Sequence, residues 1–120
     1  MILVDTNVWI NHFRRNDAEL VAHLNTGSVA CHPYIIGELA CGNLKRRREI
    51  LNLLQSLPSA PVVEHNELLA FIEARKLMGK GLGHIDIHLL AAAVLAGIPF
   101  WTEDKRLARA AEALDVAYKR

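Results

Sequence analysis

Several features that mark secreted, disulfide-rich or zinc-binding proteins are scarce in this chain of 120 residues. It contains only two cysteines, Cys31 and Cys41, which lie in apolar surroundings and form no CxxC pair. Neither a disulfide framework nor a cysteine-based zinc site is therefore indicated. We interpret both cysteines as small core residues of a protein in the reducing cytoplasm. No charged segment precedes the first apolar run, so no signal peptide is expected.

Long hydrophobic runs and an excess of one charge are also missing. The longest apolar stretch, residues 89–101, is shorter than the roughly 20 residues of a membrane helix and contains Gly97 and Pro99, so no membrane contact is expected. The 14 basic and 13 acidic side chains give a formal net charge of +1, which excludes a histone-like polycation. The hydrophobic fraction of 52% suffices for a continuous core, and the length suits one domain over residues 1–120.

Apolar runs alternate with amphipathic segments along the chain, which predicts an α/β fold. Strands are expected at residues 2–5, 28–32 and 98–101, with a short strand at 62–63 and an edge strand at 115–118. Helices are expected at about residues 6–14, 17–26, 33–42, 45–56, 64–78, 85–96 and 105–114. This order predicts a mostly parallel central sheet with helices on both faces and right-handed crossovers.

Four acidic residues lie where this fold would bring them together. Asp5 and Asp104 come just after the first strand and the 98–101 strand, Asp86 opens a strongly apolar helix, and Glu38 interrupts another. In open α/β sheets, ligands bind at the carboxyl ends of the strands. Carboxylates gathered there repel one another unless a cation neutralises them. Because the ligands are all oxygen atoms, Mg²⁺ fits this site, with Mn²⁺ as the alternative and zinc disfavoured.

Each acid also has a purely structural explanation. Asp5 could cap the helix that follows it, although the next two residues could do so equally well. Asp86 suits the first turn of a helix because of the helix dipole. Asp104 could cap the last helix, with Glu103 competing for a place in the site, and Glu38 could belong to an exposed helical stripe. The four acids carry the functional hypothesis together, because none of them carries it alone.

Basic residues gather at three places in the sequence. Residues Lys45, Arg46, Arg47 and Arg48 form a dense run, Lys80 lies in a glycine-rich loop, and Lys105 and Arg106 follow Asp104 directly. Such clusters can bind phosphate through their local field. The alternative is a solvated helix face.

Four segments resemble, in order and spacing, the motif set of PIN-domain ribonucleases, and most closely the VapC toxins of bacterial VapBC toxin–antitoxin pairs: Ile2–Asn7, Ile36–Leu39, Asp86–Ala92 and Trp101–Asp104. The resemblance implies a three-layer α/β/α PIN fold and a Mg²⁺-dependent endoribonuclease. It assigns the acidic pocket to Asp5, Glu38, Asp86 and Asp104.

The same resemblance makes Thr6 and Thr102 supporting hydroxyls. It further implies a homodimer, an RNA substrate bound by the basic residues named above, and a VapB-like antitoxin whose tail fills the active-site groove. On this hypothesis Asp5 and Asp86 hold Mg²⁺ directly, and Asp104 and Glu38 bind it through water or hold a second ion. A water activated in this way then attacks the phosphorus.

Three other classes of protein use strand-end acids. A receiver-like phosphoacceptor domain needs paired acids after its first strand and a phosphorylatable Asp at a middle strand, where this chain has Cys31 and His32. A haloacid-dehalogenase-type phosphatase needs a second Asp where Asn7 stands. A non-catalytic α/β domain whose acids only cap helices or bind metal remains the main alternative, and it predicts that neutralising Asp5 or Asp86 changes no activity.

Overall fold

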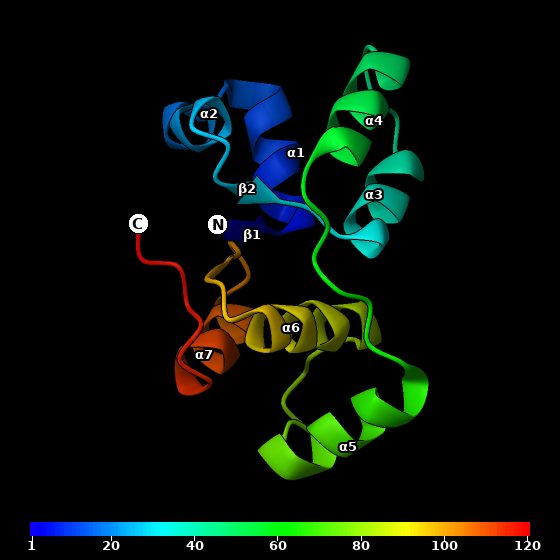
Figure 1. Ribbon diagram of the computed structural model, residues 1–120, viewed down its shortest axis with the longest axis vertical. Coiled ribbons are helices and arrows are strands. Elements are labelled where there is room, and N and C mark those ends of the chain that lie inside the picture. Colours follow the sequence, from blue (N-terminus) through cyan, green and yellow to red (C-terminus); the bar gives the residue numbers. More distant parts are fainter.

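Three short parallel strands form the centre of the computed structural model, which describes residues 1–120 (Figure 1). They are β1 (Ile2–Val4), β2 (Val29–Ala30) and β3 (Phe100–Trp101), in the order β2-β1-β3. Leu3 pairs with Ala30 on one side and with Phe100 on the other. The parallel pairing and the position of β1 in the middle place the carboxyl ends of β1 and β3 side by side.

Seven helices surround the strands, as the sequence predicted. In Figure 1, α1 and α2 lie on one side of the strands, and α6 and α7 lie on the other. The helices are α1 (Thr6–Arg15), α2 (Ala18–Asn25), α3 (Pro33–Ala40), α4 (Arg47–Ser56), α5 (His65–Arg75), α6 (His84–Ala96) and α7 (Lys105–Ala113). The mostly parallel α/β class is therefore confirmed.

Several predicted boundaries were wrong. The strands are shorter than expected, and residues 115–118 contribute only one bridge, between Ala117 and Phe100. Residues 62–63 form no strand. Helix α5 ends at Arg75 rather than Met78, because Lys76 adopts a left-handed conformation with φ of 54°. As a result Leu77 is buried and Met78 is exposed.

The main core packs around the sheet and takes buried side chains from α1, α2, α3, α4, α6 and α7. Residues 87–93 of α6 are all buried, as expected for a helix that is apolar on every side. Trp9, Leu3 and Phe100 are among the largest fully buried side chains. Of the two cysteines, Cys31 is buried as predicted, but Cys41 is exposed because it lies at the open carboxyl end of α3. A membrane span would need a longer and more continuously apolar helix than any in this fold.

Candidate active site

Asp5 occupies the junction between β1 and α1. Its backbone N–H donates to the carbonyl of Trp101 on β3, so the ends of the two strands are joined at this point. Its side chain caps α1, because Oδ1 accepts a hydrogen bond of 2.8 Å from the Thr6 N–H. The residue is only 5% exposed. Asp5 therefore caps α1, a role for which Thr6 and Asn7 were equal candidates from the sequence. A helix cap does not need to be buried, so the burial of this carboxylate indicates a further role.

A polar network surrounds the second oxygen of Asp5. The Thr102 hydroxyl donates to Asp5 Oδ2 at 2.7 Å, and the Asn7 amide donates to the same oxygen at 3.3 Å and to Thr102 Oγ1 at 3.2 Å. The Glu103 N–H donates back to Asn7 Oδ1 at 3.0 Å. These bonds fix the loop after β3 to the first turn of α1. Sequence reasoning missed Asn7 as a member of the site.

Glu38 joins this edge from helix α3. The Thr6 hydroxyl donates to Glu38 Oε1 at 2.8 Å, which links the first turn of α1 to α3. Glu38 is exposed, as the structural alternative predicted, but its carboxylate turns toward the strand end. Its other oxygen accepts no hydrogen bond within the chain.

Asp86 and Asp104 both have a local structural role. Asp86 Oδ2 accepts from the Gly83 N–H at 2.9 Å at the start of α6. Asp104 caps α7, because its Oδ1 accepts from the N–H groups of Arg106 and Leu107 at 2.9 and 3.1 Å. In each carboxylate these bonds use one oxygen and leave the other without a partner in the chain.

The electrostatics of Asp5 show which acids approach it. Burial raises the pKa of Asp5 from its ordinary value of 3.8 to about 6, against the opposing effect of the hydrogen bonds from Thr102 and Thr6. The negative charges of Asp86 and Glu38 raise this pKa further. No basic side chain forms an ion pair with Asp5, Glu38 or Asp86. A buried carboxylate beside two other acids, without a cationic side chain, is the arrangement that a bound cation would stabilise.

The four carboxylates are not arranged as closely around one point as the sequence predicted. No three acidic, histidine or cysteine side chains are arranged to hold one ion together. Repulsion between like charges favours such separation. The donor chemistry nevertheless fits Mg²⁺, which prefers oxygen atoms and keeps several waters, so that few direct protein ligands suffice.

Histidines and a tyrosine pack against one another near the start of α6. His84 and His88 lie one helical turn apart on α6, with ring centroids 4.7 Å apart, so the expectation that no second histidine is spaced to pair with His88 is wrong. Tyr34 packs edge-on against His88 and His32. His32 caps α3 by accepting a hydrogen bond of 3.0 Å from the Tyr34 N–H, and burial together with the charge of His88 lowers its pKa to about 4.

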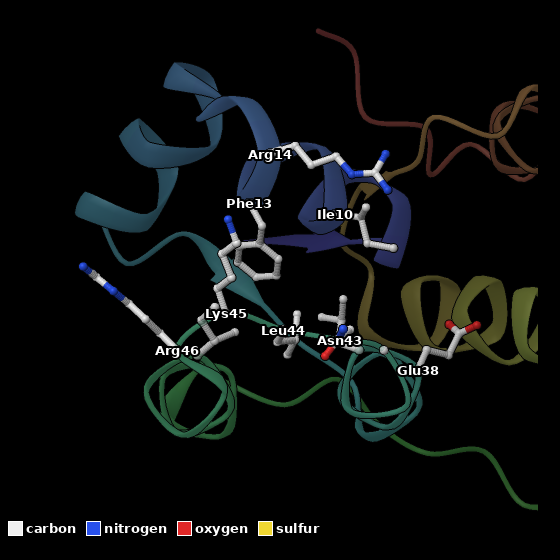
Figure 2. A pocket seen from close by; sticks show the side chains of 11 residues that line it. Ile10, Phe13, Arg14, Glu38, Asn43, Leu44, Lys45 and Arg46 are labelled. Carbon is white, nitrogen blue, oxygen red and sulfur yellow. The ribbon is translucent and has the colours of Figure 1, made fainter.

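A groove of about 750 Å³ runs between α1 and the end of α3, and we call it the α1–α3 groove. Its walls include the apolar side chains of Ile10, Phe13, Leu39, Leu44 and Ile50. Figure 2 shows Glu38 at one end of the groove and the side chains of Lys45 and Arg46 toward the other. We call the edge of the sheet that carries Asp5, Glu38, Asp86 and Asp104 the acidic edge. The groove therefore connects an apolar and basic surface with the acidic edge.

The predicted basic residues are divided between two regions. Lys45 and Arg46 line the α1–α3 groove, while Arg47 and Arg48 lie with Arg46 around a shallow hollow at the start of α4. Lys80 and Arg106 line a separate hollow between α5 and α7, and Lys105 is exposed at the start of α7.

The arrangement of acids at the ends of β1 and β3 agrees with the comparison of the chain with known proteins. The family model described as PIN domain matches residues 2–113. The chain belongs to the PIN-domain family. It is 48% identical over 118 residues to Ribonuclease VapC32 of Mycobacterium tuberculosis, from strains CDC 1551 / Oshkosh and ATCC 25618 / H37Rv, and the match covers 98% of this chain and 95% of the relative.

Solved structures support the PIN fold. PAE2754 from Pyrobaculum aerophilum is 18% identical with a TM-score of 0.62, over 91% of this chain and 83% of its own. FitAcB from Neisseria gonorrhoeae is 22% identical with a TM-score of 0.61, over 98% of this chain and 95% of its own. These structures confirm the expected three-layer α/β/α architecture. The 48% identity to Ribonuclease VapC32 confirms the resemblance to VapC ribonucleases.

Proposed function

We propose that this PIN-domain protein is a Mg²⁺-dependent endoribonuclease, the toxin of a cytoplasmic toxin–antitoxin pair. The observation that carries the proposal is the buried carboxylate of Asp5, whose pKa of about 6 reflects burial and the nearby charges of Asp86 and Glu38. The 48% identity to a protein named as a ribonuclease supports RNA as the substrate.

The chain's own residues supply ligands and orientation. Asp5 and Asp86 would hold the metal directly, and Asp104 and Glu38 would hold it through water or bind a second ion, with Mn²⁺ as a possible substitute for Mg²⁺. When bound, the metal supplies Lewis-acid polarisation of the phosphate and lowers the pKa of water. Thr102 orients Asp5, and Thr6 orients Glu38, through the hydrogen bonds described above. Water would attack the phosphorus as the bond to the ribose 3′-oxygen breaks, and the departing oxygen would take up a proton, which leaves 5′-phosphate and 3′-hydroxyl ends.

The test compares RNA ends in cells that express the wild type or Asp5→Ala. New 5′-phosphate ends are expected for the wild type and should disappear in the variant. Glu112→Ala, which removes an exposed carboxylate of α7 outside the site, is the matched control and should cleave as the wild type does. Cleavage by Asp5→Ala at the wild-type rate would instead favour the non-catalytic alternative, in which the acids only cap helices. Ends carrying 2′,3′-cyclic phosphate would contradict attack by water.

The α1–α3 groove is the proposed seat of a VapB-like antitoxin. Its apolar walls suit the apolar side of an antitoxin segment, and Arg14, Lys45 and Arg46 suit acidic side chains beside it. Ile10→Asp should weaken the complex, because it places a charge in this groove. Leu95→Asp, at an exposed leucine of α6 outside the groove, is the matched control. Equal affinity of both variants for the antitoxin would remove the groove from the proposal.

Seven basic side chains are proposed to contact RNA phosphates and to position the strand without reading its sequence: Lys45, Arg46, Arg47, Arg48, Lys80, Lys105 and Arg106. We also propose a homodimer. Exposed apolar side chains such as Leu53, Val62 and Leu69 provide surface for such a contact. Sedimentation equilibrium of the purified chain measures this state directly, and a monomer at micromolar concentration would contradict it.

A further inference from the structure

A hollow of about 270 Å³ between the end of α5 and helix α7 is lined by four cationic side chains, and we call it the cationic hollow. The four are Arg75, Lys80, Arg106 and Arg109. The rest of its lining is Leu77, Ala110, Ala113 and Leu114, with no acidic residue. None of the four cations forms an ion pair elsewhere in the chain.

An anion in the hollow would relieve the repulsion among these cations. All four side chains belong to exposed residues, so an anion can reach them from solvent, and four positive charges around one small space create a local field that attracts it. The three guanidinium groups present planar arrays of donors that match phosphate oxygens, and Lys80 adds a point charge. The chemistry therefore fits a phosphate group.

The cationic hollow is connected to the acidic edge through two short segments. The backbone N–H of Arg106 donates to Asp104, while its side chain lies in the hollow. Lys80 belongs to the same loop as Gly83, whose backbone N–H donates to Asp86, so this loop links the hollow to the acidic edge. The two segments meet at Gly81, where the Arg106 side chain passes close to the backbone: the φ of Gly81 is 75°, and a Cβ there would lie 2.7 Å from Nη1 of Arg106.

We propose that the cationic hollow binds a backbone phosphate of the same RNA strand that is cleaved at the acidic edge. This inference rests on the proposed function, and it adds Arg75 and Arg109 to the RNA-contacting residues. An acidic protein segment is the competing occupant. The observations favour RNA because the hollow is small and its lining holds four cationic side chains and no acidic one, whereas the larger α1–α3 groove offers the more extended apolar surface that a protein segment needs.

The experiment measures RNA binding and cleavage separately. Arg75→Gln/Arg109→Gln is compared with Arg15→Gln/Lys119→Gln, which removes the same charge from exposed positions outside the hollow. For binding, each pair is placed in the Asp5→Asn background with a fluorescein-labelled single-stranded RNA of mixed sequence, at several salt concentrations. The hollow variant should bind at least about fivefold more weakly. The slope of log K against log salt should fall by about 0.7 for each phosphate that the variant no longer neutralises. The control should change affinity by less than about twofold.

Cleavage is measured with the same substitutions in the otherwise wild-type chain. The hollow variant should raise KM and leave kcat nearly unchanged, since the phosphate is held equally before and during the reaction. Lys80→Gln, in the loop, is a second variant that should act in the same direction if the double variant fails to fold. Equal weakening by the hollow and control pairs, or no weakening by either, would overturn the inference.

The two proposals fail in different ways. If the wild type cleaves RNA and the hollow variants keep its KM and salt slope, the inference is wrong while the nuclease function stands. If RNA binds through the hollow but is never cleaved, the nuclease function is wrong while the hollow stands. If the hollow substitutions weaken binding of the cognate antitoxin and leave RNA binding unchanged, the occupant is a protein segment and the inference is wrong.

Discussion

Replacing Asp5 with asparagine should stabilise the metal-free protein at neutral pH while abolishing RNA cleavage. Asp5 is buried beside Asp86 and Glu38, and its pKa of about 6 exceeds the ordinary value of 3.8. Between these two values the native state holds a proton that the unfolded state has released. Stability contributed by this proton is therefore present below pH 3.8 and is lost as pH rises through 6. The full penalty for ionised Asp5 is about 3 kcal/mol.

Chemical denaturation at several pH values, in the presence of a chelator, isolates this effect. The difference in unfolding free energy between Asp5→Asn and the wild type should grow by about 2 kcal/mol in favour of the variant from about pH 4 to pH 7.5. Comparing differences across pH cancels the constant cost of hydrogen bonds that asparagine makes less well with Asn7 and Thr102. Asp115→Asn removes one exposed negative charge and serves as the control.

Mg²⁺ should reverse the order of stability. A cation that binds the native state of the wild type stabilises it in proportion to the logarithm of its concentration, and the variant lacks a ligand for that cation. A pH-independent difference between wild type and variant would refute the buried-charge argument. Equal stabilisation of both proteins by Mg²⁺ would refute the assignment of Asp5 as a ligand.

Three further perturbations follow from the same contacts. Thr102→Val removes the hydroxyl that lowers the pKa of Asp5, so the acid side of the pH–rate profile should move to higher pH, whereas Thr102→Ser should preserve it. His32→Asn keeps a side chain that can cap α3 but cannot be protonated. The unfolding free energy of the wild type should fall by about 2–3 kcal/mol through His32 between about pH 6.5 and 4, and chemical denaturation should show that the variant lacks this loss. Arg120→Ala removes a half-exposed guanidinium that contacts Asp17 and Glu103, and should cost about 1 kcal/mol at low salt and less at high salt.

The helices were predictable because their signals are local. Asp17 and Asp104 cap the helices that follow them through bonds to N–H groups two and three residues away, and such spacing is visible in the sequence. Strand ends depend on partners far along the chain. Residues 62–63 have the composition of a strand but no neighbouring strand to pair with, and Ala117 meets Phe100 at a single bridge.

The positions of the site acids were predictable for the same reason, but their contacts were not. Asp5 was expected at the end of a strand. Asp86 and Glu38 were expected on two helices, and both lie on the helices predicted for them. The bonds from Asn7 to Thr102 and from Thr102 to Asp5 join residues 95 and 97 positions apart, and no local pattern encodes them. The exposure of Cys41 and the division of the basic residues between two regions likewise depend on how the helices pack.

Asp5 and His32 together explain why the wild type alone would conceal both buried groups. As pH falls from neutrality toward 4, protonation of Asp5 relieves repulsion in the native state, because its pKa is raised by burial. Over the same range the native state resists protonation of His32, whose pKa burial has lowered to about 4. The first change stabilises the fold, the second destabilises it, and their magnitudes are similar. The contributions of these two groups therefore largely cancel, while the lowered pKa values of His12, Asp17 and His88 add further losses of stability at low pH. Only the single variants separate the effect of the Asp5 carboxylate from that of the His32 cap.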